Sequence, residues 1–181
     1  MHPRLNELFG YIDGQHQQLR ATYESVPELH RHTRPTPQEW SVADVIGHLT
    51  LVERRITGLF AMRIPAARAA GLAAETDESP VLPAIDLAPV LDRSRKIVSP
   101  DTGDPQKLPQ PASWDEYEQA REQFKQAALA GDGLALSELT HPHPVFGSQT
   151  FYAWIAFVGA HATRHAAQIR ETAERLPRAG P

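Results

Sequence analysis

Three histidines in two distant segments of the chain have the residue type and the spacing of a metal site. His161 and His165 lie four positions apart in FVGAHATRHAAQI. In a helix this spacing places both imidazoles on one face, one turn apart, so that both can reach one ion. His48, in VADVIGHLTLVERRI, could add a third nitrogen from another helix. Three histidines would leave a tetrahedral zinc with one open position, which is typical of a catalytic site.

The surroundings of the His161 and His165 pair favour this interpretation. The pair lies beside an apolar stripe, where an imidazole without a partner would be costly, and small residues around it leave room for a ligand. Gln168 follows His165 by three positions and could orient a ligand ring. The alternative is that these are hydrogen-bonded or surface histidines. The residues alone leave both interpretations open.

Asp44 is the one candidate for a catalytic carboxylate. It precedes His48 by one turn and could act as a fourth ligand or as a hydrogen-bond partner of a ligand. A capping role explains it equally well, because Ser41 and Asp44 have the spacing of a capping box. Glu53 is predicted to lie on a solvated face with Arg54 and Arg55.

The remaining histidines are predicted to be structural or exposed. His16 falls on the apolar face of the first predicted helix; it is a reserve ligand, with a structural role favoured. His141 and His143 flank prolines in HPHPVFG. An HxH pair can bind a metal, but the prolines favour solvent-exposed loop residues. Trp40 and Trp154 are candidates for pocket walls, with a place in the core favoured.

Hydrophobic spacing predicts four long amphipathic helices and almost no strand. Ser41 and Ser113 each begin a helix as the first residue of a capping box. HPHPVFG is predicted to be a turn. The predicted helices cover residues 4–25, 41–62, 113–130 and 149–176.

The region from 64 to 111 is irregular and holds eight of the sixteen prolines. Two short helices are predicted in it, near 66–74 and 87–97, and an extended loop over 99–113. Such a long insertion often serves as a lid, a pocket wall or an oligomer contact. The fold class is therefore an all-α four-helix bundle with a long crossover, in one domain over 1–181, with a disordered tail at 177–181.

Composition narrows the function classes. The net charge is −4 and no basic stripe stands out, so nucleic acid is not expected as a partner. No apolar run is long enough to span a membrane. The chain has no cysteine, so it can form neither a disulfide nor a thiolate nucleophile. We expect a cytoplasmic protein. Phosphate-binding glycine loops and the G-x-S-x-G elbow are absent from the sequence.

The segments WSVADVIGHL and HPVFGSQTFYAWIAFVGAHATRHAAQI together resemble the DinB/YfiT-like superfamily, and most closely its DinB-like members. The resemblance covers most of the chain, and only loosely the 64–111 region. It implies a four-helix bundle with a divalent metal, zinc or nickel, held by His48, His161 and His165, with water in the remaining positions. It also implies a homodimer. Relatives include a thiol-dependent isomerase and S-transferases that use bacillithiol, mycothiol or glutathione.

These observations lead to three hypotheses for function. The first is a metal-dependent transferase that adds a low-molecular-weight thiol to a small electrophile; the thiol must come from a cofactor, since the chain has no cysteine. The second is a metal-dependent hydrolase, for which Asp44 is the nearest base. The third is a non-catalytic stress protein that binds a metal or a small ligand. A bundle without metal is the remaining possibility.

Overall fold

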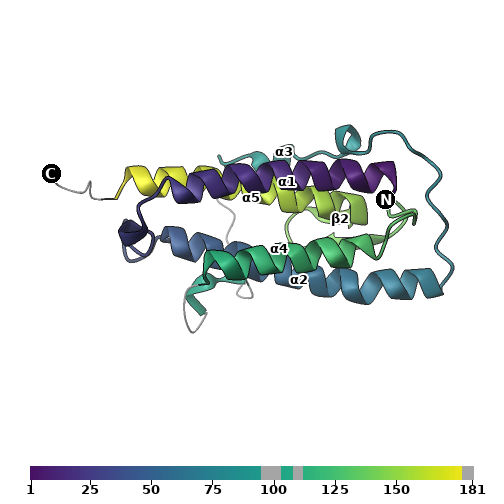
Figure 1. Ribbon diagram of the computed structural model, residues 1–181, viewed down its shortest axis with the longest axis horizontal. Helices are drawn as coiled ribbons and strands as arrows, with labels where there is room; N and C mark the ends of the chain where they lie inside the picture. The colour runs from purple at the N-terminus through teal and green to yellow at the C-terminus, as the bar shows by residue number, and fades with distance from the viewer. Residues whose placement is uncertain (95–102, 108–111, 177–181) are drawn as a thin grey trace.

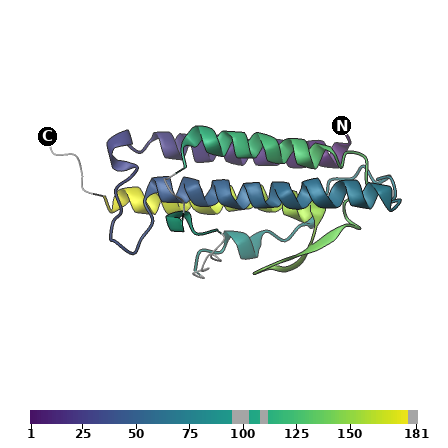
Figure 2. The same ribbon diagram turned by 90° about the horizontal axis from the view of Figure 1, so that it is seen from below.

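The computed structural model describes residues 1–94, 103–107 and 112–176, and these residues form the predicted helical bundle (Figure 1). The helix α1 packs along α5, and α2 packs along α4 and also contacts α5. Figure 2 shows α2 and α5 in one layer, with α1 and α4 in a second layer above it in the view. The long helices are α1 (Pro3–Glu24), α2 (Val42–Ala69), α4 (Trp114–Leu129) and α5 (Phe151–Glu174).

The predicted capping boxes are confirmed. The Ser41 hydroxyl accepts from the Asp44 backbone N–H, and the Asp44 carboxylate accepts from the Ser41 backbone N–H. Ser113 and Glu116 form the same pair at the start of α4. Each box satisfies two backbone N–H groups that a helix would otherwise leave without a partner, so these starts are fixed locally.

Part of the predicted insertion belongs to α2. This helix continues through Pro65 to Ala69, so of the short helix predicted near 66–74 only 66–69 are helical, as the last turn of α2. Proline removes one helical hydrogen bond but does not end the helix here. Of the helix predicted near 87–97, the structure has α3 (Ala88–Leu91), and 95–97 lie outside the described residues.

The other short elements are single helical turns: η1 (Glu28–His30), η2 (Leu82–Ala84) and η4 (Pro105–Lys107). Much of the loop predicted over 99–113, and the tail predicted to be disordered at 177–181, also lie outside the described residues.

The expectation of a simple turn before the last helix was wrong. The strands β1 (Thr140–His143) and β2 (Gly147–Thr150) form an antiparallel hairpin in which Thr140 pairs with Thr150 and His143 with Gly147. The prolines of this segment argued against a strand. In a two-stranded sheet each strand is an edge strand, however, and an edge strand tolerates the missing N–H of proline. The hairpin leads directly into α5.

The expectation that Glu53 is solvated was also wrong. Its side chain is buried between α2 and α4, and its carboxylate accepts two hydrogen bonds from Arg121, at 2.7 Å from Nε and 2.6 Å from Nη2. Arg121 also donates to the Tyr117 hydroxyl and to the Ile12 carbonyl. Apolar side chains fill the interior around this network. None of the described helices has the length and apolar character needed to cross a bilayer.

Candidate metal centre

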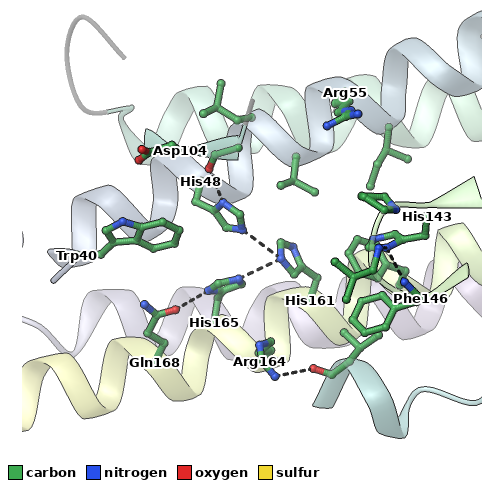
Figure 3. A pocket seen from close by; sticks show the side chains of 18 of the residues that line it. Trp40, His48, Arg55, Asp104, His143, Phe146, His161, Arg164, His165 and Gln168 are labelled. Carbon is green, nitrogen blue, oxygen red and sulfur yellow. Dashed lines mark hydrogen bonds between the residues drawn. The ribbon is translucent and has the colours of Figure 1, made fainter. Parts of the chain in front are cut away.

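The structure brings His48, His161 and His165 together, buried between α2 and α5 (Figure 3). His48 comes from α2, and the other two come from successive turns of α5. The Nε2 atom of His161 lies 3.2 Å from Nε2 of His48 and 3.0 Å from Nε2 of His165. One ligand atom from each histidine lies within 4.8 Å of the other two. The three rings therefore converge on one point.

The position of this cluster follows from the helices that carry it. His161 and His165 share one face of α5, as their four-residue spacing predicts. That face packs toward α2, and all three side chains are buried, with exposed fractions of 6–9%. A buried ring nitrogen has lost its hydrogen bonds to water. Each of these nitrogens therefore needs a hydrogen-bond partner within the protein.

In His48 and in His165, a neighbouring oxygen atom fixes which ring nitrogen carries the proton. Nδ1 of His48 lies 2.7 Å from the Gly103 carbonyl oxygen, and Nδ1 of His165 lies 2.8 Å from Oε1 of Gln168. Both oxygens are acceptors, so each Nδ1 must carry the proton and each Nε2 must present a lone pair. The predicted role of Gln168 in orienting a ligand ring is confirmed.

The three Nε2 atoms that face one another consequently have more lone pairs than protons to pair with them. A proton on Nε2 of His161 can be donated to His48 or to His165, but not to both. One buried lone pair then lacks a donor, and a cation would satisfy it. The Zn–N distances of about 2.0–2.1 Å in a tetrahedral site imply nitrogen separations of about 3.3–3.4 Å. Two of the three separations in the cluster, 3.0 and 3.2 Å, are close to this value, and all three ligand atoms lie within 4.8 Å of one another, so the donor set is compatible with a divalent ion.

The electrostatics keep these rings in the form that binds metals. Burial lowers the pKa of His161 well below its ordinary value, and positive charge on His165 or His48 would lower it further. Burial likewise lowers the pKa of His165 and of His48. The three imidazoles are therefore neutral at pH 7, and neutral imidazole is the ligand form.

A pocket of about 700 Å³ opens beside the cluster. It lies along α2 and α5 and is bordered by the β1–β2 hairpin, by α3 and by η4 (Figure 3). Trp40 forms part of its wall, with its ring centre 5.0 Å from that of His48. On the other side Phe157 stacks on His161 at 5.0 Å. Aromatic side chains thus flank the histidines on two sides.

The structure places Asp44 away from the cluster. Its carboxylate accepts from Ser41 and from Arg34, whose Nε lies 2.8 Å from Oδ2. Burial alone would raise the pKa of Asp44, but the hydrogen bonds from Arg34 and Ser41 outweigh it and the pKa is lowered. Asp44 therefore caps α2. His16 also lies elsewhere, with its ring centre 5.6 Å from those of Trp114 and Tyr117.

Sequence reasoning missed three groups at this site. Gly103 orients His48 through its carbonyl, which no residue type reveals. Arg55 lies at the pocket and not on a purely solvated face. His143 was expected to be exposed, but it lies half-buried on β1 and lines the pocket. Burial and the nearby charge of Arg55 lower the pKa of His143 to about 4. The alternating histidines in HPHPVFG were the one sequence feature that could have identified His143 as a residue of this site.

The fold and the site define a helical-bundle protein with a buried three-histidine cluster that opens on a pocket. The sequence profile of the DinB superfamily matches residues 11–169, and the chain belongs to this superfamily. It is similar to the uncharacterized protein YuaE of Bacillus subtilis (strain 168), with 30% identity over 148 residues, which covers 81% of this chain and 85% of YuaE. No solved structure matches the chain.

Proposed function

We propose that this protein is a divalent-metal-dependent transferase that joins a low-molecular-weight thiol to a small electrophile. The observation that carries the proposal is the cluster of three imidazole nitrogens with more lone pairs than protons, at the edge of a pocket of about 700 Å³. Such a combination of ligands and adjoining space suits a catalytic ion better than a structural one.

The residues of the site have distinct roles in this proposal. His48, His161 and His165 hold the ion, and zinc and nickel are the expected metals, since both accept imidazole ligands. The Gly103 carbonyl and Gln168 fix the orientation of two ligand rings. A divalent cation held by these nitrogens lowers the pKa of a thiol or water molecule that it binds.

The thiol must be supplied by a second molecule, because the chain contains no cysteine. In the reaction, the sulfur attacks the electrophilic carbon, a C–S bond forms, and the leaving group departs with its electron pair. The thiol's proton passes to solvent through the open pocket. The aromatic walls around the cluster, Trp40 and Phe157, exclude part of the water and provide apolar surface for the electrophile.

A metal-dependent hydrolase is less well supported. It needs a base that takes a proton from water, and Asp44 was the candidate. That carboxylate already accepts hydrogen bonds from Ser41 at the start of α2 and from Arg34. The family resemblance also predicts a homodimer, and the lack of an apolar membrane-spanning run in the sequence led us to expect a cytoplasmic location. Both stay predictions, and gel filtration at several protein concentrations tests the first.

The first test is the metal content of protein purified without an affinity tag. We expect about one zinc or nickel ion per chain in the wild type, and loss of that ion in His161→Ala. The matched control is His32→Ala, which removes an exposed histidine outside the pocket and should keep the ion. Chelation should lower the free energy of unfolding of the wild type by about 4 kcal/mol where free metal had been 1,000-fold above Kd.

Turnover is then measured with 1-chloro-2,4-dinitrobenzene and with bacillithiol, mycothiol and glutathione in turn. Metal-loaded wild type should exceed the metal-free protein with at least one thiol. Metal binding without any thiol-dependent turnover across a wider electrophile panel would favour a non-catalytic binding protein. Absence of metal, with no uptake on titration, would contradict the proposal as a whole.

A further inference from the structure

One end of the pocket is formed by the β1–β2 hairpin and carries His143 (Figure 3). Three aromatic side chains surround its ring, with ring centres at 4.7 Å (Phe146), 4.9 Å (Trp154) and 4.8 Å (Phe157). The Phe157 ring in turn stacks on His161, with ring centres 5.0 Å apart. His143 therefore lies one aromatic ring away from the three-histidine cluster, along the wall of the same pocket.

The hydrogen bonds of His143 fix which of its ring nitrogens carries the proton. Nδ1 accepts from the backbone N–H of Val145 at 3.1 Å and from that of Phe146 at 3.2 Å. Two donors face Nδ1, so this atom keeps its lone pair. The ring is neutral at pH 7, because its pKa is lowered to about 4. A neutral imidazole with a lone pair on Nδ1 carries its proton on Nε2.

This proton position decides between two uses of the two histidines on β1. His141 and His143 alternate along the strand, so their side chains share one face, and both line the pocket. Such a pair could hold a second metal ion through a lone pair on each ring. In His143, however, the turn takes the lone pair of Nδ1 and the proton occupies Nε2. The strand therefore offers the pocket a hydrogen-bond donor and not a metal ligand.

The Nε2–H group of His143 is available to a molecule in the pocket. The described residues provide no acceptor for it, and Nε2 is not among their side-chain nitrogens that are buried without a partner. It is therefore accessible from the pocket that the ring lines. Aromatic rings around it limit the water that competes for this donor. A fixed donor in such surroundings contributes most to an atom that gains negative charge during a reaction.

We propose that His143 is a catalytic residue that donates its Nε2–H to the leaving oxygen of an epoxide, and that the electrophile is of this class. The inference rests on the proposed function, because it assigns the electrophile of the same site. The leaving atom of an epoxide is an oxygen that gains negative charge and accepts strongly, whereas a halide leaving group is a weak acceptor. The rings of Phe146, Trp154 and Phe157 suit an aryl substituent on the epoxide.

The reaction is the opening of the three-membered ring by the thiol. The thiolate sulfur attacks one ring carbon, and a C–S bond forms. The C–O bond at that carbon breaks, and its electron pair stays on the oxygen, which remains attached through the second ring carbon. The Nε2–H of His143 donates a hydrogen bond to this alkoxide, which then takes a proton from water. The product is a β-hydroxy thioether, and His143 keeps its proton.

The test compares styrene oxide with benzyl chloride, which keeps the phenyl ring and the benzylic carbon but expels chloride. Bacillithiol, mycothiol and glutathione each serve as the thiol, with metal-loaded protein of measured metal content. We expect His143→Asn to lower the ratio of the kcat/KM for styrene oxide to that for benzyl chloride by about 10- to 100-fold, the size of one hydrogen bond to a charged oxygen. The control His32→Asn, an exposed histidine outside the pocket, should keep the wild-type ratio.

A second exchange separates the donor from the turn. Asparagine can place its carboxamide oxygen where Nδ1 of His143 accepts from the turn, but it has no donor at the position of Nε2. Glutamine is longer and can place its amide N–H near that position, but it has no acceptor at Nδ1. We therefore expect His143→Gln to keep a larger ratio than His143→Asn. If His143→Gln falls as far, the turn and not the donor sets the ratio, and the proposal is overturned.

Failure of this inference and failure of the proposed function give different results. Thiol-dependent turnover of benzyl chloride without turnover of styrene oxide would overturn the role of His143 and leave the transferase intact. If neither substrate turns over with any thiol, the proposed function fails, and styrene oxide alone is added to metal-free protein. A shift of the His143 Nε2 resonance would then support the hydrogen bond to the epoxide oxygen, and no shift at the solubility limit of styrene oxide would overturn it.

Discussion

Two buried polar clusters in this bundle differ in how well their hydrogen bonds are satisfied. Glu53, Arg121 and Tyr117 form one between α2 and α4. The histidines His48, His161 and His165 form the other between α2 and α5. In the first, both carboxylate oxygens accept from guanidinium N–H groups, and two further N–H groups of Arg121 donate to Tyr117 and to a backbone carbonyl. In the second, three nitrogens converge with too few protons to pair them.

The surroundings of the two clusters differ in the same sense. The Glu53 and Arg121 pair lies in the packed interior and does not line the pocket of about 700 Å³, whereas the histidines border that pocket. A buried network whose donors and acceptors match is complete and holds helices together. A buried cluster that does not match needs an additional partner. This difference, more than burial or residue type, separates a structural network from a candidate site.

The largest expected effect tests the structural half of this comparison. Arg121→Met leaves the Glu53 carboxylate buried without a partner, so we expect the free energy of unfolding to fall by about 3–5 kcal/mol. Chemical denaturation of metal-free protein measures it. The double variant Glu53→Leu with Arg121→Met should recover most of the loss, since an apolar pair leaves no unpaired charge. A loss under about 1 kcal/mol in the single variant would contradict this role.

A smaller effect, on metal affinity, is expected from changing Gln168, the hydrogen-bond partner of His165. Gln168→Leu removes the acceptor for Nδ1–H of His165, and we expect metal affinity to fall by about 10–100-fold. Gln168→Glu keeps an acceptor oxygen and should retain most of the affinity. Competition with a metallochromic chelator measures both. Equal affinity of Gln168→Leu and wild type would show that the ring needs no orienting partner.

The smallest effect concerns pH in the metal-free protein. The folded-state pKa of His161 lies below the unfolded value of about 6.5, so the folded protein binds fewer protons than the unfolded chain. The stability from this group is present above pH 6.5 and is lost as pH falls below it, by about 1.4 kcal/mol per pH unit for each such histidine. The unfolding free energy between pH 6 and 5 should therefore decline less steeply in His161→Ala than in wild type.

His32→Ala serves as the control for this slope. It removes an exposed histidine and should follow the wild-type pH dependence. The same slope in wild type and His161→Ala would mean that the cluster accepts protons while the protein stays folded. In that case the convergence of the three rings would be looser than their nitrogen separations indicate.

The sequence by itself determined the features that depend on neighbours within one or two helical turns. The capping boxes at Ser41 and Ser113, the helical bundle, and the shared face of His161 and His165 follow from local hydrogen bonding and helical periodicity. Assigning His48 to the same site required the family resemblance, because no local rule links positions 113 residues apart.

Only the tertiary structure decided the rest. Glu53 stands beside two arginines in the sequence, yet its partner is Arg121, 68 residues away on α4. His143 stands between prolines in a stretch that predicts an exposed loop, yet the hairpin folds over the pocket and buries it against aromatic rings of α5. Side-chain burial and the partners of a charge depend on which elements pack together, and that packing is a property of the whole chain.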